Sequence, residues 1–330
     1  MKGRARVAWR RSLLIAAGVS LWAAHKLRSR GYSLQGRTVL ITGGSRGLGL
    51  ALARQMADEG ARLAICGRNP ESLDQARASL AKLGAEVIAV PADVTDPASV
   101  GELIEAVRQR LGLIDVLINN AGVIEVGPAV TMSVADYEEA MATNFWGMLY
   151  PTLALLPEMR ARRSGRIVNI TSIGGKLGIP HLLPYSASKF AAVGFSQGLR
   201  AEVAADGIKV VTVCPGLIRT GSPRNAIFRG QHRSEYAWFS ISDALPGLSL
   251  SAENAARRIV AACRRGDAEV LFPVPVRVAA VVNAIAPGLT ASVLAAVDRL
   301  LPGPDGGSRP SPSWLSRLGD RAAKKYNQIA

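Results

Sequence analysis

Cysteine and histidine are scarce in this sequence, and their scarcity excludes two classes of protein. Three of each occur among 330 residues, and no spacing brings several together; they are Cys66, Cys214, Cys263, His25, His181 and His232. An odd number of distant cysteines does not make a disulfide framework, so we expect small buried thiols in a reducing compartment. The scattered positions also predict neither a structural nor a catalytic metal site.

Acidic residues are absent from the first 37 positions, where nine basic side chains flank an uncharged run, Ser12 to Ala24. More than half of the net charge of +15 lies in this stretch. The run is shorter than the roughly 20 residues of a membrane-spanning helix. We therefore predict that residues 1–35 form an uncleaved anchor or an interfacial helix on anionic lipid, at the cytoplasmic side of a membrane.

Two other interpretations of this arm compete. A cleaved signal peptide would have a similar apolar run, but His25 and Lys26 directly follow Ala24, where small residues are expected. A nucleic-acid-binding tail is disfavoured because the basic residues flank an apolar run instead of forming a solvated stripe. No nucleic-acid partner is therefore expected.

No repeat or low-complexity tract interrupts the middle of the chain, which alternates short β-branched runs with longer helical patterns. The apolar runs are nearly continuous, as in strands that helices cover on both sides. The pattern predicts an α/β fold with a doubly wound parallel seven-stranded sheet, the Rossmann fold. The expected strands are residues 38–42, 62–66, 86–90, 115–119, 166–171, 208–213 and 269–272.

A glycine-rich turn, Thr42 to Gly49, follows the first expected strand and opens a helical pattern. Glycines in that position allow a tight turn and a close approach of the backbone to a pyrophosphate, which the free N–H groups of the helix start would bind. A lone glycine cluster is a weak signal. The strand before it and the helix after it make this one a predicted dinucleotide site.

The end of the second expected strand predicts which dinucleotide binds. Many nicotinamide sites place an Asp or Glu there to accept a hydrogen bond from the ribose 2′-hydroxyl. This sequence has Gly67 and Arg68 instead, and Arg46 lies within the glycine turn. Two guanidinium groups without a carboxylate suit a 2′-phosphate. We therefore predict NADP(H) as the cofactor in preference to NAD(H).

Tyr185 and Lys189 stand four residues apart, so both would emerge from one face of a helix. Such a pair arises easily by chance, and alone it does not identify a site. It is preceded, in order, by the glycine turn, by NNAG at residues 119–122 and by ITS, which ends at Ser172. With these four motifs the chain resembles the short-chain dehydrogenase/reductase family over residues 36–273.

The resemblance implies a catalytic role for four residues. Tyr185 would be the general acid/base, Lys189 would bind the nicotinamide ribose, and Ser172 would polarise the substrate carbonyl. Asn144 would complete the tetrad through a water relay. We expect the Lys189 ammonium to lower the pKa of the Tyr185 phenol, so that the phenol exchanges a proton with the substrate at neutral pH.

The resemblance also implies a set of cofactor-binding residues. Asp93 would hold the adenine amine, and Thr220 would contact the carboxamide of the nicotinamide, which carries the hydride. The complete set is Gly43, Ser45, Arg46, Gly47, Leu48, Gly49, Arg68, Asp93, Val94, Asn120, Ala121, Gly122, Tyr185, Lys189, Pro215, Gly216 and Thr220.

The implied function is interconversion of a ketone and a secondary alcohol with NADP(H), leaning towards reduction. The implied organisation is an arm (1–35), a dinucleotide-binding catalytic domain (36–273) and an apolar extension with a basic tail (274–330). Residues 216–250 mix polar and aromatic side chains without periodicity, and we expect this long connection to bind substrate. The alternative is a catalytically silent dinucleotide-binding sensor or scaffold at the membrane.

A second apolar run, Val278 to Val297, has twenty residues without a charge, but Pro287 and Gly288 interrupt it. It could span a bilayer, form a helical hairpin that lies in the interface or caps the active site, or be buried in a homo-oligomer. With the arm, it favours a membrane surface and a lipophilic substrate, such as a long-chain 3-keto compound or a sterol-like ketone. His181 could touch substrate, although a solvent-facing histidine is the commoner case.

Overall fold

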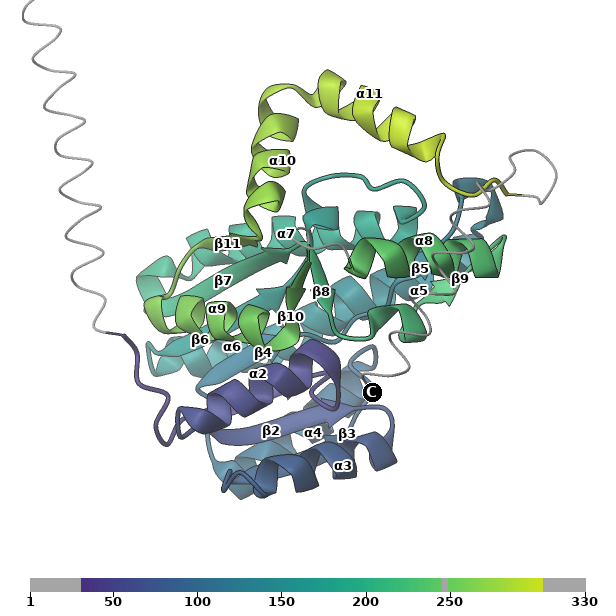
Figure 1. Ribbon diagram of the computed structural model, residues 1–330. Coiled ribbons are helices and arrows are strands. Elements are labelled where there is room, and N and C mark those ends of the chain that lie inside the picture. Colours follow the sequence, from purple (N-terminus) through teal and green to yellow (C-terminus); the bar gives the residue numbers. More distant parts are fainter. Residues whose placement is uncertain (1–30, 245–248, 305–330) are drawn as a thin grey trace, which may run out of the picture. The chain divides into compact units, whose positions relative to one another are not determined.

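The computed structural model describes residues 31–244 and 249–304 (Figure 1). The chain divides into two compact units, Met1–Ser33 and Leu34–Ala330, and the second unit contains the whole sheet. Residues 1–30 of the predicted arm lie outside the described residues, so the expected anchor stays a prediction.

The centre of the second unit is a parallel sheet of seven strands, as predicted, in the spatial order β11, β7, β6, β4, β1, β2, β3. Each strand begins and ends within two residues of its expected position. The bounds are β1 Thr38–Thr42, β2 Arg62–Gly67, β3 Val87–Pro91, β4 Val116–Asn119, β6 Gly165–Ile170, β7 Ile208–Pro215 and β11 Glu269–Phe272.

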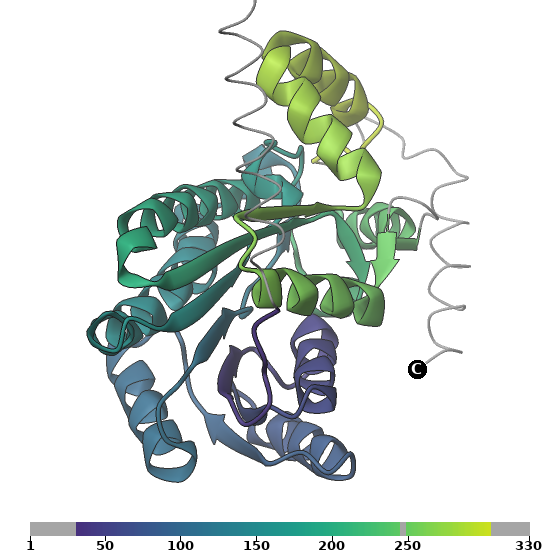
Figure 2. The ribbon, with the colours of Figure 1, turned by 90° about the vertical axis from the view of Figure 1, so that its left-hand side faces the viewer.

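Helices cover both faces of the sheet (Figure 2). One face carries α2 (Gly47–Asp58), α3 (Pro70–Ala81) and α9 (Ala252–Arg265); the other carries α4 (Pro97–Leu111), α6 (Gly147–Ala161) and α7 (Leu183–Glu202). Local sequence explains where α3 and α4 begin. Asn69 and Asp96 each accept a hydrogen bond from a backbone N–H of the first turn, and a proline occupies the first helical position after each.

The core lies between the strands and these helices. All five residues of β1 are buried, and Leu40 and Leu117 pack in one cluster with Ile104 of α4 and Leu155 of α6. Because both faces of the sheet are covered, the strands have no polar face, which explains their continuous apolar sequence. The removal of this surface from water is the main favourable contribution to folding.

The order of the strands creates the place for a site. The chain runs outward from β1 to β2 and β3, then crosses back to β4, so that β1 has β2 on one side and β4 on the other. The loops after β1 and β4 therefore diverge at the carboxyl ends of two adjacent strands. Ligands of open α/β sheets bind in the crevice at such a switch point.

The segment 216–250 has more order than the sequence predicted. It contains β8 (Leu217–Arg219), β9 (Ile227–Phe228), α8 (His232–Ala244) and β10 (Ser249–Ser251), and β9 pairs with β5 (Glu125–Val126). Phe228 packs edge-on against Tyr236 and Phe239, with ring centroids 5.6 and 6.3 Å apart. Tertiary packing stabilises α8, so its sequence lacks a strong helical spacing of apolar residues.

The described chain ends with two apolar helices, α10 (Val274–Ile285) and α11 (Pro287–Asp298). Pro287 begins α11, so the apolar run is broken where its proline and glycine predicted a break. Figure 1 shows α11, in yellow, turning away from the axis of α10. Over residues 31–244 and 249–304, the fold has no helix with both the length and the apolar character that crossing a membrane requires.

Candidate active site

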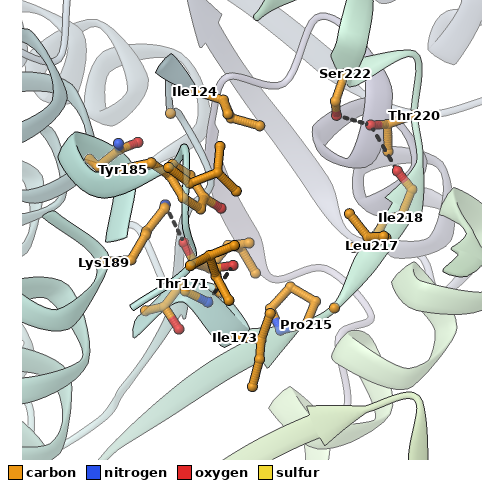
Figure 3. Close-up of a pocket in the computed structure, with 18 of the residues that line it drawn as sticks. Ile124, Thr171, Ile173, Tyr185, Lys189, Pro215, Leu217, Ile218, Thr220 and Ser222 are labelled. Carbon is orange, nitrogen blue, oxygen red and sulfur yellow. Dashed lines mark hydrogen bonds between the residues drawn. The ribbon is translucent and has the colours of Figure 1, made fainter. Parts of the chain in front are cut away.

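A cavity of about 400 Å³ lies at the switch point, at the carboxyl ends of β4, β6 and β7 (Figure 3). The loops after β4 and β6 contribute Asn120 and Ser172 to its lining, the last residue of β7 contributes Pro215, and α7 contributes Tyr185 and Lys189. Residues far apart in the sequence therefore meet in one place. Its other polar lining residues are Asn144, Thr171, Thr220 and Ser222.

The glycine turn has the backbone that a phosphate cradle needs. Gly43 and Gly47 have φ angles of +63° and +54°, which favour glycine over other residues. A Cβ atom on Gly49 would lie 2.1 Å from the carbonyl oxygen of Gly43, so only glycine fits at position 49. The turn leads directly into the first turn of α2, whose N–H groups are available to an anion.

Asn120 has a structural task that the sequence did not predict. Its side-chain amide donates to the carbonyl oxygens of Thr42 and Gly43, both at 3.0 Å, and so braces the glycine turn against the loop after β4. The Thr42 hydroxyl in turn accepts hydrogen bonds from the backbone N–H groups of Asn120 and Ala121, at 2.9 and 3.1 Å. The two loops that diverge at the switch point are thereby joined by hydrogen bonds.

The expected adenosine end of the site has two exposed guanidinium groups. Arg46 and Arg68 are both exposed, and no ion pair joins either of them to an acid of the described chain. A Cβ on Gly67 would lie 3.6 Å from Ser45 Oγ, so the end of β2 lies against the glycine turn. Arg46 and Arg68 are the next residues in sequence after Ser45 and Gly67, so their backbones lie on adjoining segments beside the turn.

Two further expected cofactor residues, Asp93 and Thr220, lie in the loops after β3 and β8. Asp93 Oδ1 accepts hydrogen bonds from the N–H and the hydroxyl of Thr95, at 2.9 and 2.8 Å, which fixes the loop after β3. Thr220 lies beside the glycine turn, because a Cβ on Gly47 would be 3.3 Å from the Thr220 Cβ. Its hydroxyl is 2.5 Å from that of Ser222, which also lines the cavity.

Tyr185 and Lys189 emerge from the same side of α7, as their spacing predicted (Figure 3). The Lys189 Nζ atom lies 5.6 Å from the centre of the Tyr185 ring and donates a hydrogen bond to the Ile170 carbonyl oxygen, at 3.2 Å. Ser172 Oγ accepts a hydrogen bond from the N–H of Gly174, at 3.0 Å. The hydroxyl proton of Ser172 therefore stays available for donation into the cavity.

One expectation about Tyr185 is wrong for this structure. Burial raises the pKa of Tyr185 to about 12, and the hydrogen bond with Ser172 lowers it only in part. Burial also lowers the pKa of Lys189 to about 8. Burial thus outweighs the influences that would make the phenol more acidic, and Tyr185 is a protonated donor at neutral pH.

Asn144 lies on a π-helical turn, Ala142–Trp146, between α5 (Val134–Met141) and α6. Its side chain accepts from the N–H of Val123 and donates to the carbonyl oxygen of Val123, both at 3.0 Å. It also donates to Ser188 Oγ, at 3.0 Å. These bonds occupy the amide, so a water relay at this position would depend on the backbone, and π-helical turns are frequent at functional sites.

A buried carboxylate, Glu125 of β5, lies close to the catalytic pair and was not predicted. Within residues 31–244 and 249–304, neither of its oxygens has a hydrogen-bond partner. Burial raises its pKa to about 7. Its charge raises the pKa of both Tyr185 and Lys189, which places it within electrostatic reach of the two.

His181 is buried, so the solvent-facing interpretation from the sequence is wrong, and the residue does not line this cavity. Its side chain is only 5% exposed, and its Nδ1 atom lies 2.9 Å from a carboxylate oxygen of Glu235 on α8. The acid that buries this histidine is 54 positions away in the sequence. No local pattern could show that contact.

Ten apolar side chains complete the wall of the cavity, and no motif identified them. The sequence pointed to the segment 216–250 but not to individual residues within it. The ten are Val123, Ile124, Ile170, Ile173, Ile179, Leu182, Leu217, Ile218, Trp238 and Phe239. In the described ranges no three His, Cys, Asp or Glu side chains form a group that could hold a metal ion, and all three cysteines are buried and free.

Comparison with known proteins finds relatives that share this fold and these motifs. A "Dehydrogenase/reductase SDR family protein 7-like" of Anopheles gambiae is 37% identical over 262 residues, 78% of this chain and 81% of the relative. "Ketoacyl reductase HetN" of a Nostoc species is 38% identical over 56% of this chain and 65% of its own. The structure of an actinorhodin polyketide ketoreductase with NADPH has a TM-score of 0.64 and 32% identity, and the match covers 72% of this chain and 95% of that one.

The sequence profile described as short chain dehydrogenase matches residues 37–227, more than half of the chain. The match includes the glycine turn, Asn144, Ser172 and the Tyr185–Lys189 pair, which the structure brings around one cavity. The chain belongs to the short-chain dehydrogenase/reductase family and is an oxidoreductase with a Rossmann-type fold.

Proposed function

We propose that this oxidoreductase uses NADPH to reduce a lipophilic ketone to a secondary alcohol at the cytoplasmic face of a membrane. The observation that carries the proposal is the make-up of the cavity, where Ser172 and Tyr185 share the wall with ten apolar side chains. A ketone oxygen beside the two hydroxyl groups would leave its carbon substituents against apolar surface. Burial of those substituents would favour binding.

The side chains of this site suit reduction. Tyr185 is protonated at neutral pH and would give its proton to the substrate oxygen as negative charge develops there. Ser172 would donate a hydrogen bond to the same oxygen. Lys189 would bind the ribose of the cofactor and, when charged, stabilise the phenolate that Tyr185 leaves. The cofactor supplies the hydride when it is bound.

The test of this function is a panel of ketones of increasing chain length, including 3-keto compounds and a sterol-like ketone. Oxidation of NADPH is followed by absorbance with detergent present. We expect kcat/KM to rise with the apolar surface of the ketone, because the cavity wall is apolar. Turnover restricted to short polar ketones would rule out the lipophilic substrate class but not the reductase.

A preference for NADP(H) is supported by Arg46 and Arg68 and by the absence of an acid at Gly67. A 2′-phosphate would lie between two guanidinium groups that form no ion pair with an acid of the described chain. The related ketoreductase structure with NADPH supports the same cofactor. We expect the double variant Arg46→Ala/Arg68→Ala to lose at least tenfold in its preference for NADPH over NADH. An unchanged preference would remove the basis of this proposal.

A membrane surface is supported by the exposed apolar side chains of α10 and α11. Val278, Ile285, Leu289 and Val293 are 54–79% exposed, and such a patch is unusual on a soluble surface. Each helix has 12 residues, about 18 Å of length, so neither reaches across a hydrocarbon core of about 30 Å. The helices would lie in the interface.

A homo-oligomer is supported by a second group of exposed apolar side chains. Trp146, Leu153 and Phe190 are 41%, 49% and 45% exposed, and they come from the π-helical turn, α6 and α7. Self-association would remove these side chains from water. Light scattering of the purified chain in detergent measures the mass of the particle, and a monomer would contradict this part of the proposal.

The competing function is a dinucleotide-binding sensor without turnover. Asn144, Ser172, Tyr185 and Lys189 are all present and all line the cavity, which favours the enzyme. The variant Tyr185→Phe separates the two functions. We expect it to bind NADPH like the parent and to lose turnover by at least a hundredfold. A sensor would show no turnover in either protein.

A further inference from the structure

Outside the catalytic groups, Glu235 on α8 is an acidic side chain that the fold buries completely. Its side chain is 0% exposed. Acidic side chains are almost never fully buried unless they are paired, because taking a carboxylate out of water costs several kcal/mol. A structure that buries such a group has made strong contacts to it.

Glu235 holds two side chains at once. His181 Nδ1 lies 2.9 and 3.0 Å from its two oxygens, and Trp238 Nε1 donates to Oε2 at 2.5 Å. Since the carboxylate only accepts, Nδ1 of His181 carries a proton. On the other side of the ring, Nε2 of His181 lies 3.7 Å from Asp298 Oδ1 at the end of α11. Charge-assisted hydrogen bonds of this kind are shorter and stronger than neutral ones.

Both partners of Glu235 lead to the wall of the catalytic cavity. Trp238 lines that cavity, and its ring lies edge-on to the rings of His181 and Phe239, with centroids 6.1 and 5.7 Å apart. His181 itself does not line the cavity, but Leu182, the next residue, does. The contacts of Glu235 are thus made directly behind the surface that a substrate would touch.

The backbone around His181 is also held in place. Its φ is +61°, in the left-handed region that non-glycine residues adopt rarely and at a cost. Its carbonyl oxygen accepts a hydrogen bond from Gly127 N–H, at 2.8 Å. A conformation of this kind persists only where its surroundings determine it, and the bond to Glu235 is one of those surroundings.

We propose that Glu235 is a positioning residue that determines substrate specificity, because it fixes the Trp238 indole and the His181 loop as one wall of the substrate pocket. This inference rests on the proposed function, in which the pocket receives a ketone. Loosening the wall changes how the bulk of a ketone fits. It leaves the chemistry at Tyr185 intact, since neither Glu235 nor His181 touches the cavity.

The test compares Glu235→Gln, Trp238→Phe and the double variant with the parent enzyme. Glu253→Gln is the matched control, because Glu253 is an exposed acid in the first turn of α9. Steady-state kinetics with NADPH use a compact ketone, cyclohexanone, and a long one, 2-tridecanone. We expect KM for 2-tridecanone to rise about five- to twenty-fold in each single variant. In Glu235→Gln, kcat should stay within twofold and cyclohexanone reduction should be unaffected.

The double variant decides whether Glu235 acts through Trp238. A common mechanism predicts that its KM for 2-tridecanone equals that of either single variant, and the control behaves like the parent. Three results would mean that Glu235 has only a structural role. They are an equal rise in KM for both ketones, a fall in kcat in Glu235→Gln, or additive effects on KM in the double variant. Should Glu235→Gln not fold, Trp238→Phe and His181→Gln address the same wall.

A spectroscopic signature separates this inference from the proposed function. The indole N–H of Trp238 bonds to a carboxylate, so its proton resonance in the full-length protein should lie downfield; it is assigned by its loss in Trp238→Phe. We expect Glu235→Gln to move this resonance upfield by at least 0.5 ppm, on the order of the effect of a lost charged acceptor. An unmoved resonance would overturn the inference even if the enzyme reduces both ketones. A parent that reduces neither ketone would overturn the function alone.

Discussion

Tyr185 and Lys189 share one buried environment, and burial shifts their pKa values in opposite directions. The neutral form is favoured in both, which raises the pKa of the phenol and lowers the pKa of the amine. Near neutral pH Tyr185 keeps its proton, whereas Lys189, with a pKa of about 8, is the group that titrates. The pH dependence of reduction should therefore follow the titration of Lys189.

We expect kcat/KM for ketone reduction to be constant below about pH 7 and to fall as pH rises through about 8. Lys189 loses its charge over that interval, and kcat/KM reports the groups of the free enzyme. The measurement is initial rates from pH 6 to 10 in buffers of constant ionic strength. Lys189→Arg keeps a charge throughout, so any residual activity should lack this fall. A flat profile in the parent would contradict the assignment.

The buried Glu125 side chain makes the stability of the fold depend on pH. Its pKa is raised from 4.5 to about 7 in the fold, so the folded chain binds the extra proton between those values and stability falls as pH rises through them. Glu125→Gln removes the buried charge. We expect the free energy of unfolding to rise by about 1–3 kcal/mol at pH 8 and to be unchanged below pH 4.5.

The measurement for Glu125→Gln is denaturant unfolding at the two pH values. Glu102→Gln is the control, since Glu102 is exposed on α4 and should show no gain at either pH. If the free energy of unfolding of Glu125→Gln rose equally at both pH values, the changed shape of the side chain, and not its lost charge, would be responsible.

At the scale of elements, the β1 turn and α2 form a unit whose geometry depends on glycine. Gly49 has no room for a methyl group, because its Cβ would meet both the Gly43 carbonyl oxygen and the side chain of Asn120. Asn120 is also the residue that joins the turn to the loop after β4. A substitution at Gly49 should therefore disturb both the glycine turn and the hydrogen bonds of Asn120 that join this turn to the loop after β4.

We expect Gly49→Ala to weaken NADPH binding at least tenfold and to lower the melting temperature. Gly101→Ala is its matched control, since Gly101 lies within α4 and nothing is within 4 Å of its would-be Cβ. That variant should bind NADPH normally and gain about 0.5–1 kcal/mol, because alanine favours a helix over glycine. Fluorescence titration with NADPH and thermal unfolding provide the comparison. Normal NADPH binding by Gly49→Ala would mean that the glycine turn is not part of the cofactor site.

The strands and helices differ in how well the local sequence predicts them. The seven strands were predictable because continuous β-branched runs make long local signals, and α3 and α4 because Asn69 and Asp96 cap them with a proline next in sequence. The helix α8 was not, since its order comes from Phe228 and other aromatic residues that pack across the segment. Long-range packing leaves no period in the local sequence.

At the scale of the whole molecule, charge and apolar surface point to the same partner. The net charge is +15, and the described part of the C-terminal extension has Asp298 as its one acid, which faces His181. The exposed apolar side chains of α10 and α11 lie in that same extension. An anionic lipid surface would complement both features.

We expect the full-length chain to float with anionic vesicles at low salt and to bind neutral vesicles more weakly. Ile285→Asp/Leu289→Asp should weaken flotation at least fivefold, because it places two charges in the apolar patch. Leu83→Asp is the control, since Leu83 is 56% exposed and Leu289 59%, but Leu83 follows α3 and lies outside the patch. A parent that stays with the soluble fraction, or a control that weakens binding equally, would contradict the membrane proposal.

The strands, the position of the glycine turn and the pairing of Tyr185 with Lys189 depend on residues close together in the chain, so they could be predicted from the sequence. The protonation of those two side chains, the burial of His181 against Glu235 and the identity of the apolar wall could not. Each depends on what is excluded from water by segments distant in sequence. Burial is a property of the packed molecule, and no local pattern carries it.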